Sequence, residues 1–236
     1  MQYSSLCSIE RVSTIEVLAT RIAEVITLRL SLEKEKQSVI RYGLIGILQI
    51  LTLFFMTVIM GLLTKTLYES IVVFLAVGFI RKSTGGAHAK TMGGCNSVSI
   101  LSIAILAITS RYFLGVPIDL IMNIGITTIV FLISFYIFYL RVPVDSPNKP
   151  IVNPEKIRRL RRESFGKLIV LMILTIIAFL AAAEVERLYS IASSLRVAVL
   201  WQTFTLTNRG GAVLATADIM VGEFFNQVQQ RVRRGH

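Results

Sequence analysis

Charged residues are scarce in this sequence, and so are the side chains that build metal sites and disulfide frameworks. Asp, Glu, Lys and Arg make up 17% of the 236 residues, whereas apolar residues make up 54%. The apolar residues gather in long runs instead of recurring at amphipathic spacing, which argues against a soluble enzyme or a disordered chain. With a mean hydropathy of +0.69, the composition predicts an all-α, polytopic membrane protein.

Cysteine and histidine occur only twice each. These numbers argue against a disulfide scaffold and fall short of the four ligands of a structural zinc site, so no metal or other cofactor is expected. The sequence also contains neither a His-Glu-x-x-His motif nor a Gly-x-Ser-x-Gly motif. Cys7 lies in a polar N-terminal stretch and Cys95 in a glycine-rich loop, and we expect both to be free thiols. The first residues lack the basic and apolar regions of a signal peptide, so none is predicted.

Basic residues outnumber acidic ones, with 25 Lys and Arg against 14 Asp and Glu and a net charge of +11. They lie mainly between and beside the apolar runs, where they would anchor cytoplasmic loops and meet anionic lipid headgroups. The lipid bilayer is therefore an expected partner, and nucleic acid is not.

Six apolar runs are predicted to cross the membrane as helices: 42–63, 67–80, 97–114, 118–140, 168–183 and 188–206. The first would reach ~33 Å at ~1.5 Å per residue, enough for a hydrocarbon core of ~30 Å. The second has only 14 residues and is also compatible with a re-entrant segment. Counting it as a span leaves 21 of the 25 basic residues on the cytoplasmic side, as the positive-inside rule requires. The last run carries polar residues, which favours a helix that faces the bundle interior.

The two ends of the chain are less apolar than the predicted membrane domain of residues 42–206. In residues 1–41 a helical face predicts an amphipathic helix or helix pair on the membrane surface or against the bundle, with a plain solvated helix as the alternative; the face comprises Ile9, Val12, Ile15, Ala19, Ile22 and Ile26. Residues 207–236 form a predicted cytoplasmic tail, in which Val213, Met220, Phe224 and Val228 indicate a short amphipathic helix. Both termini are then cytoplasmic.

The loop of residues 81–96 carries the candidate chemistry. It holds four glycines in ten residues, together with His88 and Cys95. A thiol becomes a useful nucleophile when a base or a positive field raises its thiolate fraction, and Arg81, Lys82, His88 and Lys90 are candidates for that role. Seven residues of straight helix would separate histidine and cysteine by ~10 Å along the axis.

The segment must therefore bend if His88 and Cys95 are to meet, and we expect Gly93 and Gly94 to make the turn. Backbone amides near Gly94 and Cys95 would then donate to an oxyanion. The alternative is structural: a small buried cysteine, a solvated histidine and ordinary glycine turns.

These motifs resemble the accessory gene regulator B (AgrB) family of quorum-sensing peptidases. The resemblance rests on Gly85-Gly86-Ala87-His88 with Cys95 seven residues after the histidine. It rests also on the proline- and lysine-containing segment Val142-Pro143-Val144-Asp145-Ser146-Pro147-Asn148-Lys149-Pro150-Ile151 and on Gln202-Thr203-Phe204-Thr205-Leu206-Thr207 in the last run. It covers roughly residues 35 to 208 and does not extend to the tail.

The resemblance implies a cysteine endopeptidase of the bacterial cytoplasmic membrane, with its catalytic loop on the cytoplasmic side. Cys95, activated by His88, would cleave the C-terminal part from a short AgrD-type propeptide through an acyl-enzyme thioester. The propeptide's own cysteine or serine would then close a thiolactone or lactone ring, giving an autoinducing peptide. The resemblance further implies a homodimer and a need for Arg81 and Gly86 near the site.

Two further assignments stay open. Basic residues of the loop after the fourth run either attract an acidic region of the propeptide or anchor the topology; they are Lys149, Lys156, Arg158, Arg159, Arg161 and Arg162. Asp145 either orients His88 or stabilises a turn before Ser146-Pro147. A different class of function, a small transporter or binding protein, would use Glu69, Arg111 and Arg196 inside the spans.

Overall fold

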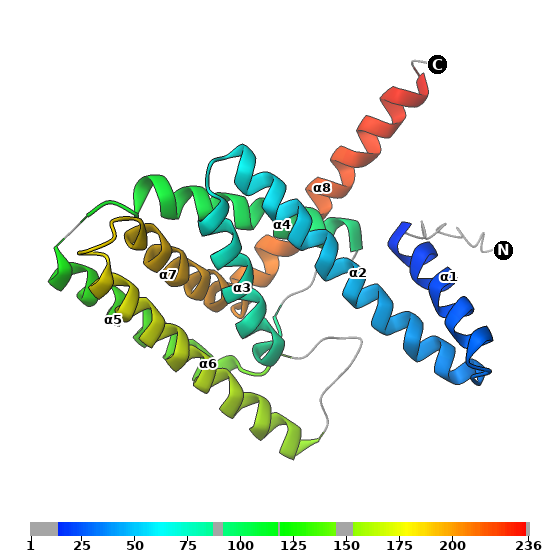
Figure 1. The fold of residues 1–236 in the computed structure, drawn as a ribbon, viewed down its shortest axis with the longest axis horizontal. Coiled ribbons are helices and arrows are strands. Elements are labelled where there is room, and N and C mark those ends of the chain that lie inside the picture. The colour runs from blue at the N-terminus through cyan, green and yellow to red at the C-terminus, as the bar shows by residue number, and fades with distance from the viewer. Residues whose placement is uncertain (1–13, 87–91, 118, 145–152, 235–236) are drawn as a thin grey trace, which may run out of the picture. The chain divides into compact units, whose positions relative to one another are not determined.

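The computed structural model describes residues 14–86, 92–117, 119–144 and 153–234, and these are helical apart from short connections. The all-α prediction is confirmed for this part of the chain. The helices, drawn in Figure 1, are α1 (Thr14–Arg29), α2 (Lys34–Leu63), α3 (Leu67–Thr84), α4 (Met92–Ile108), the π-helical η1 (Thr109–Phe113), α5 (Leu120–Arg141), α6 (Pro154–Ala181), α7 (Arg187–Thr205) and α8 (Asn208–Arg234).

The chain forms two compact units, residues 1–53 and 54–236. In the first unit, α1 lies within the predicted amphipathic segment. It buries Ala19, Ala23 and Thr27 at four-residue spacing, and Ile15 and Ile22 beside them are half-buried. The periodicity therefore identified the less exposed side of the helix, while its placement on a membrane surface stays a prediction.

The second unit is built around α3 and α7, which run in the same direction, since their first turns meet at Glu69 and Ser190 and their last turns at Thr84 and Gln202. Helices α4, α5 and α6 pack against this pair (Figure 1). The core between them is apolar, and its buried side chains include Ile80, Phe131, Phe138, Leu168, Val197 and Val199. Helix α7 also buries most of its polar residues, which confirms that it faces the interior of the bundle.

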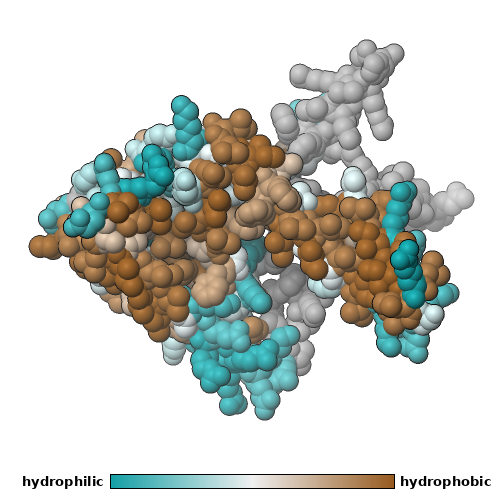
Figure 2. All heavy atoms as spheres, in the orientation of Figure 1, coloured by the Kyte–Doolittle hydropathy of each residue, from teal (hydrophilic) through white to brown (hydrophobic). Residues whose placement is uncertain are grey.

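Among the described residues, four helices are long and apolar enough to cross a membrane: α2, α4 with η1, α5 and α6. They overlap the predicted runs 42–63, 97–114, 118–140 and 168–183. Large apolar side chains are exposed along them, and Figure 2 shows these as continuous hydrophobic areas. The chain is therefore a membrane protein.

The other two predicted spans, 67–80 and 188–206, lie in the central helices α3 and α7. Both helices contain several polar residues, which lower their mean hydropathy. Most of these polar side chains are buried against each other and against neighbouring helices. Crossing by α3 and α7, and hence the count of six spans, stays a prediction.

Side-chain and backbone contacts define the two ends of the second unit. At one end the Tyr112 hydroxyl donates to the Thr64 carbonyl at 3.1 Å, and the Ser193 hydroxyl donates to the Leu114 carbonyl at 2.8 Å. At the other end Arg141, the last residue of α5, donates to the Asn208 side chain at 2.8 Å. Helix α7 has its first turns at the former end and its last turn beside Asn208 at the latter.

The tail differs from its prediction in length. Helix α8 runs for 27 residues, so the expectation of a short helix is wrong. Its packed side also differs, because Leu214 and Asp218 are buried whereas Val213 and Met220 are exposed. The helix contacts α4 and α7 through the positions next to the predicted apolar stripe, which periodicity alone did not distinguish.

Gly61→Ala is expected to destabilise the protein. A Cβ atom there would lie 2.9 Å from the Leu67 Cα and 3.1 Å from the Ser70 hydroxyl oxygen, so the α2–α3 turn would have to open, at a cost of about 1–3 kcal/mol. Thermal unfolding in detergent measures the effect. Gly78→Ala is the matched control because nothing lies within 4 Å of its Cβ; equal unfolding temperatures for the two variants would contradict the close approach at Gly61.

Candidate functional site

Three segments that are distant in sequence meet at the end of the second unit where α3 and α7 finish. Gly85, directly after α3, pairs with Val144 in an isolated parallel β-bridge. The Val144 N–H donates to the Thr84 carbonyl at 2.8 Å. Gln202, in the last turn of α7, contacts the same residues. These segments carry parts of the motifs on which the family resemblance rests, and the fold brings the described parts, Gly85–Gly86, Val144 and Gln202, to one place.

Gln202 is the polar centre of this meeting point. Its Nε2 donates to the Thr84 hydroxyl at 2.9 Å and to the Gly85 carbonyl at 3.0 Å. Gln202 and Thr84 are both fully buried, and the Gln202 Oε1 has no hydrogen-bond partner among the described residues. Because the buried Gln202 amide donates to the Gly85 carbonyl, which lies just beyond the end of α3, it fixes the backbone where the chain leaves that helix.

The chain leaves α3 through two glycines with left-handed backbone angles, φ 72° at Gly85 and 137° at Gly86. A Cβ atom on Gly85 would collide with the Val144 carbonyl oxygen, and one on Gly86 would lie 3.5 Å from the Gln202 Nε2. Only glycine fits this conformation beside a neighbouring backbone without strain. A tight turn therefore occurs at the first glycine pair of the loop, whereas the turn was expected at the second pair.

The second glycine pair does not form the expected turn. Helix α4 begins at Met92, so Gly93 and Gly94 are helical. Glycine permits a turn but does not impose one. Cys95 consequently lies in the first turn of α4. The Cys95 side chain, His88 and Lys90 fall outside the description, so the pairing of thiol and imidazole stays a prediction.

Arg81 occupies the last turn of α3. Its carbonyl accepts the Gly85 N–H at 3.0 Å, which closes the helix, and its side chain is half-buried. The remaining candidates from the loop after α5, Asp145 and Lys149, lie outside the described residues.

The basic residues of α6 fall into two groups. Arg161 donates to the Tyr139 carbonyl and stacks over the Tyr139 ring at 4.9 Å, and Arg159 pairs with Glu163 at 3.6 Å. A second group is exposed and has no partner among the described residues: Lys156, Arg158 and Arg162. Figure 2 shows hydrophilic residues over this first part of α6. The contact with Tyr139 places these charges near the exit of α5, at the same end as the Gly85 turn.

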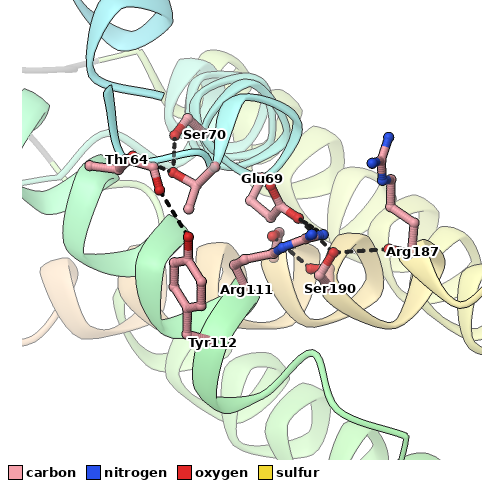
Figure 3. A network of polar contacts seen from close by, with 9 residues as sticks. Thr64, Glu69, Ser70, Arg111, Tyr112, Arg187 and Ser190 are labelled. Atoms are coloured by element: carbon pink, nitrogen blue, oxygen red, sulfur yellow. Dashed lines mark hydrogen bonds and ion pairs between the residues drawn. The ribbon is translucent and has the colours of Figure 1, made fainter. Parts of the chain in front are cut away.

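A second polar cluster lies at the opposite end of the unit (Figure 3). Glu69, 1% exposed, pairs with Arg111 at 3.3 Å and accepts a hydrogen bond from the Ser190 hydroxyl at 2.6 Å. Arg196 is buried elsewhere, 3.4 Å from the Ser193 hydroxyl and 5.1 Å above the Phe179 ring. Its contacts do not join it to Glu69 or Arg111, so the three residues of the transport hypothesis do not form one site.

The described residues contain no group of three or more His, Cys, Asp or Glu side chains placed to hold a metal ion.

Comparison with known proteins identifies the family. The sequence matches the model for Accessory gene regulator B over residues 19–206. The chain belongs to the AgrB family. It is 30% identical over 214 residues to a putative AgrB-like protein of Clostridium perfringens strain SM101 and to putative AgrB-like protein 2 of strain 13, which covers 86% of this chain and 96% of each relative. A putative AgrB-like protein of Clostridium acetobutylicum is 27% identical over 165 residues, 66% of this chain and 74% of its own.

No solved structure matches the chain. The resemblance read from the motifs is thus confirmed, and the AgrB match includes the whole α3–α7 bundle together with the second half of α1. It ends at Leu206, two residues before α8 begins. The sequence did not predict the hydrogen bonds of Gln202 to Thr84 and Gly85. The feature that could have indicated them is the position of an amide side chain within an apolar run.

Gln202→Leu is expected to loosen the Gly85–Val144 bridge. It removes two buried hydrogen bonds of about 1 kcal/mol each, so the Val144 amide should exchange with solvent about tenfold faster or more. Hydrogen-exchange mass spectrometry of the peptide around Val144 measures this. Thr203→Val is the matched control, since Thr203 bonds Ser134 at 2.9 Å and not the bridge. Equal protection at Val144 in Gln202→Leu and the native protein would show that Gln202 does not hold the turn.

Proposed function

We propose that this AgrB-family protein is a membrane cysteine endopeptidase that cleaves the C-terminal part of a short AgrD-type propeptide and supports cyclisation of the remainder. One observation carries the proposal: the Gly85 turn, the Val144 segment and Gln202 converge, so the loop that holds His88 starts from a fixed point at the bundle end where α4 and Cys95 begin.

The proposed reaction needs no cofactor. The Cys95 thiolate attacks a propeptide carbonyl, His88 takes the thiol proton and returns it to the leaving amine, and the C-terminal fragment departs. The resulting acyl-enzyme thioester is displaced by the propeptide's own cysteine or serine, which restores the Cys95 thiol and leaves a thiolactone or lactone ring. Bond energy is conserved because one acyl bond is exchanged for another.

The position of Cys95 in the first turn of α4 supports its role as nucleophile. The positive end of a helix dipole favours a thiolate over a thiol. First-turn amides point toward the helix N-terminus, which supports an oxyanion hole made by amides near Gly94 and Cys95. Gly93 next to them has no side chain that would obstruct a propeptide approaching these amides. Arg81 and the Gly85–Gly86 turn fix the point at which the loop begins.

The topology proposed for this chemistry has six spans, with both termini and the catalytic loop in the cytoplasm. Two features support it. The central helix α7 reaches from the Leu114 end of the unit to the Asn208 end, as a span would, and α3 reaches from the Glu69 cluster to the Gly85 turn. The positive-inside rule assigns the latter end to the cytoplasm, because most basic residues lie in its segments.

Recognition of the propeptide is proposed to be electrostatic. Lys156, Arg158 and Arg162 are exposed and unpaired among the described residues, so their charge is available to an acidic propeptide region. Lys149 is proposed to join them. The lipid bilayer holds the propeptide's amphipathic helix, and a homodimer is proposed as the working assembly on the basis of family membership.

Cys95→Ser and His88→Ala are expected to abolish cleavage of the propeptide, because the first removes the nucleophile and the second its base. The assay co-expresses each variant with the short open reading frame beside the gene and searches for trimmed and cyclic products by mass spectrometry. Cys7→Ser is the matched control and should retain native activity. Cleavage by both His88→Ala and Cys95→Ser proteins that insert normally would refute the mechanism.

The double variant Arg158→Gln/Arg162→Gln is expected to lower the cleavage rate at low ionic strength by about tenfold and to reduce its salt dependence, because two attractive charges are lost. Initial rates at several salt concentrations measure this. Lys65→Gln/Arg187→Gln, which removes two charges at the opposite end of the unit, should leave the rate unchanged. A native salt dependence in the α6 variant would mean that these cations only anchor the topology.

A further inference from the structure

A hollow of about 140 Å³ lies at the end of the second unit away from the Gly85 turn. Gly61, Lys65, Tyr68, Glu69, Arg111 and Arg187 are among its lining residues. Since a water molecule occupies about 30 Å³ of liquid volume, the space can take several waters or one compact ion. The peptidase chemistry proposed for the opposite end makes no use of it.

The charge of this hollow is positive. Three cations face one carboxylate, and Glu69 is already occupied by Arg111 at 3.3 Å and by the Ser190 hydroxyl at 2.6 Å (Figure 3). Arg187 stacks over the Tyr68 ring at 4.9 Å, and neither Arg187 nor Lys65 has an acidic partner among the described residues. Two positive charges are therefore left for a ligand.

Backbone groups add to this field. Helix α3 begins at Leu67, beside the hollow, and its N-cap Thr66 makes no side-chain capping bond. The first N–H groups of a helix lack intrahelical acceptors and carry the positive end of its dipole, so they favour an anion. The unpaired cations and the positive end of the α3 dipole thus both favour an anionic ligand.

The distribution of basic residues gives a further reason to expect a ligand. Lys65, Arg111 and Arg187 are three of only four Lys or Arg residues outside the predicted cytoplasmic segments. The positive-inside rule gives no reason for cations on this side of the membrane. Their convergence on one hollow needs another explanation.

We propose that the hollow binds a phosphate group, with Lys65 and Arg187 as its cationic contacts and Arg111 held in place by Glu69. The ligand is a phospholipid headgroup or free phosphate. Leu62 and Tyr68 in the lining are exposed, and so are Leu63, Tyr112 and Phe113, which lie next to lining residues in the sequence or one residue beyond. Exposed aromatic and apolar side chains are typical of a membrane interface, and they favour the lipid. Arg187 is pre-oriented by its stacking on Tyr68, which suits it to phosphate oxygens.

The test compares Lys65→Gln/Arg187→Gln with the native protein in detergent. Both residues are exposed, and size-exclusion chromatography and circular dichroism confirm that the variant is folded. Binding of soluble dihexanoyl phosphatidylglycerol and of inorganic phosphate is measured by isothermal titration calorimetry. The variant should bind at least about tenfold more weakly, a loss typical of one charge-assisted contact. Arg158→Gln/Arg162→Gln, with the same change of charge, should bind as the native protein does.

The two probes separate the sources. Tighter binding of the lipid than of phosphate, lost in the hollow variant, identifies a headgroup site. Binding of inorganic phosphate that the lipid does not exceed, also lost in the variant, identifies free phosphate as the ligand. Native affinity for both probes in Lys65→Gln/Arg187→Gln, an equal loss in the α6 variant, or no binding by the native protein would overturn the proposal.

Discussion

The buried amide of Gln202 is the contact that holds together the end of the bundle where α3 and α7 finish. A single side chain of α7 bonds the last residue of α3 and the carbonyl of Gly85, and Val144 pairs with the same short segment. Inside a membrane bundle, water is not available to replace a lost partner, so each of these bonds is costly to break. Three chain segments are held together because separating them would leave buried polar groups unpaired.

The same principle explains why α3 and α7 are the central helices although they are not the most apolar ones. At one end they share the Gln202 bonds, and at the other they share the contact of Ser190 with Glu69. Polar side chains that would be unfavourable against lipid become stabilising when they face each other. The more apolar helices α5 and α6 can then cover the pair and expose their apolar side chains.

The sequence predicted what depends on local pattern. Apolar runs located the helices, and the polar residues of 188–206 predicted an interior helix, whereas the sharp turn expected at Gly93 and Gly94 occurs at Gly85 and Gly86. What it missed depends on contacts between distant segments. Gly93 and Gly94 have the same composition as the first pair but are helical, and nothing in the pattern of α6 separates Arg161, used against Tyr139, from Arg158, which is left exposed. The pairing of Gly85 with Val144 follows from the packing of α3, α5 and α7, which no single segment encodes.

The two ends of the bundle use their cations in different ways. On α6 the unpaired charges are exposed, so salt screens them beyond about 8–10 Å, and the proposed attraction of an acidic propeptide region would act within that distance. At the other end Lys65, Arg111 and Arg187 line a small hollow beside a buried carboxylate, where the proposed ligand would be selected by the geometry of the lining. Because Arg111 is fixed by Glu69, the hollow keeps its shape without a ligand. A site with this fixed geometry would lose little conformational entropy on binding a ligand. The exposed charges of α6 would instead increase the association rate of an acidic partner. On the two proposals together, one chain would separate long-range attraction from short-range recognition by placing them at opposite ends of the same helix pair.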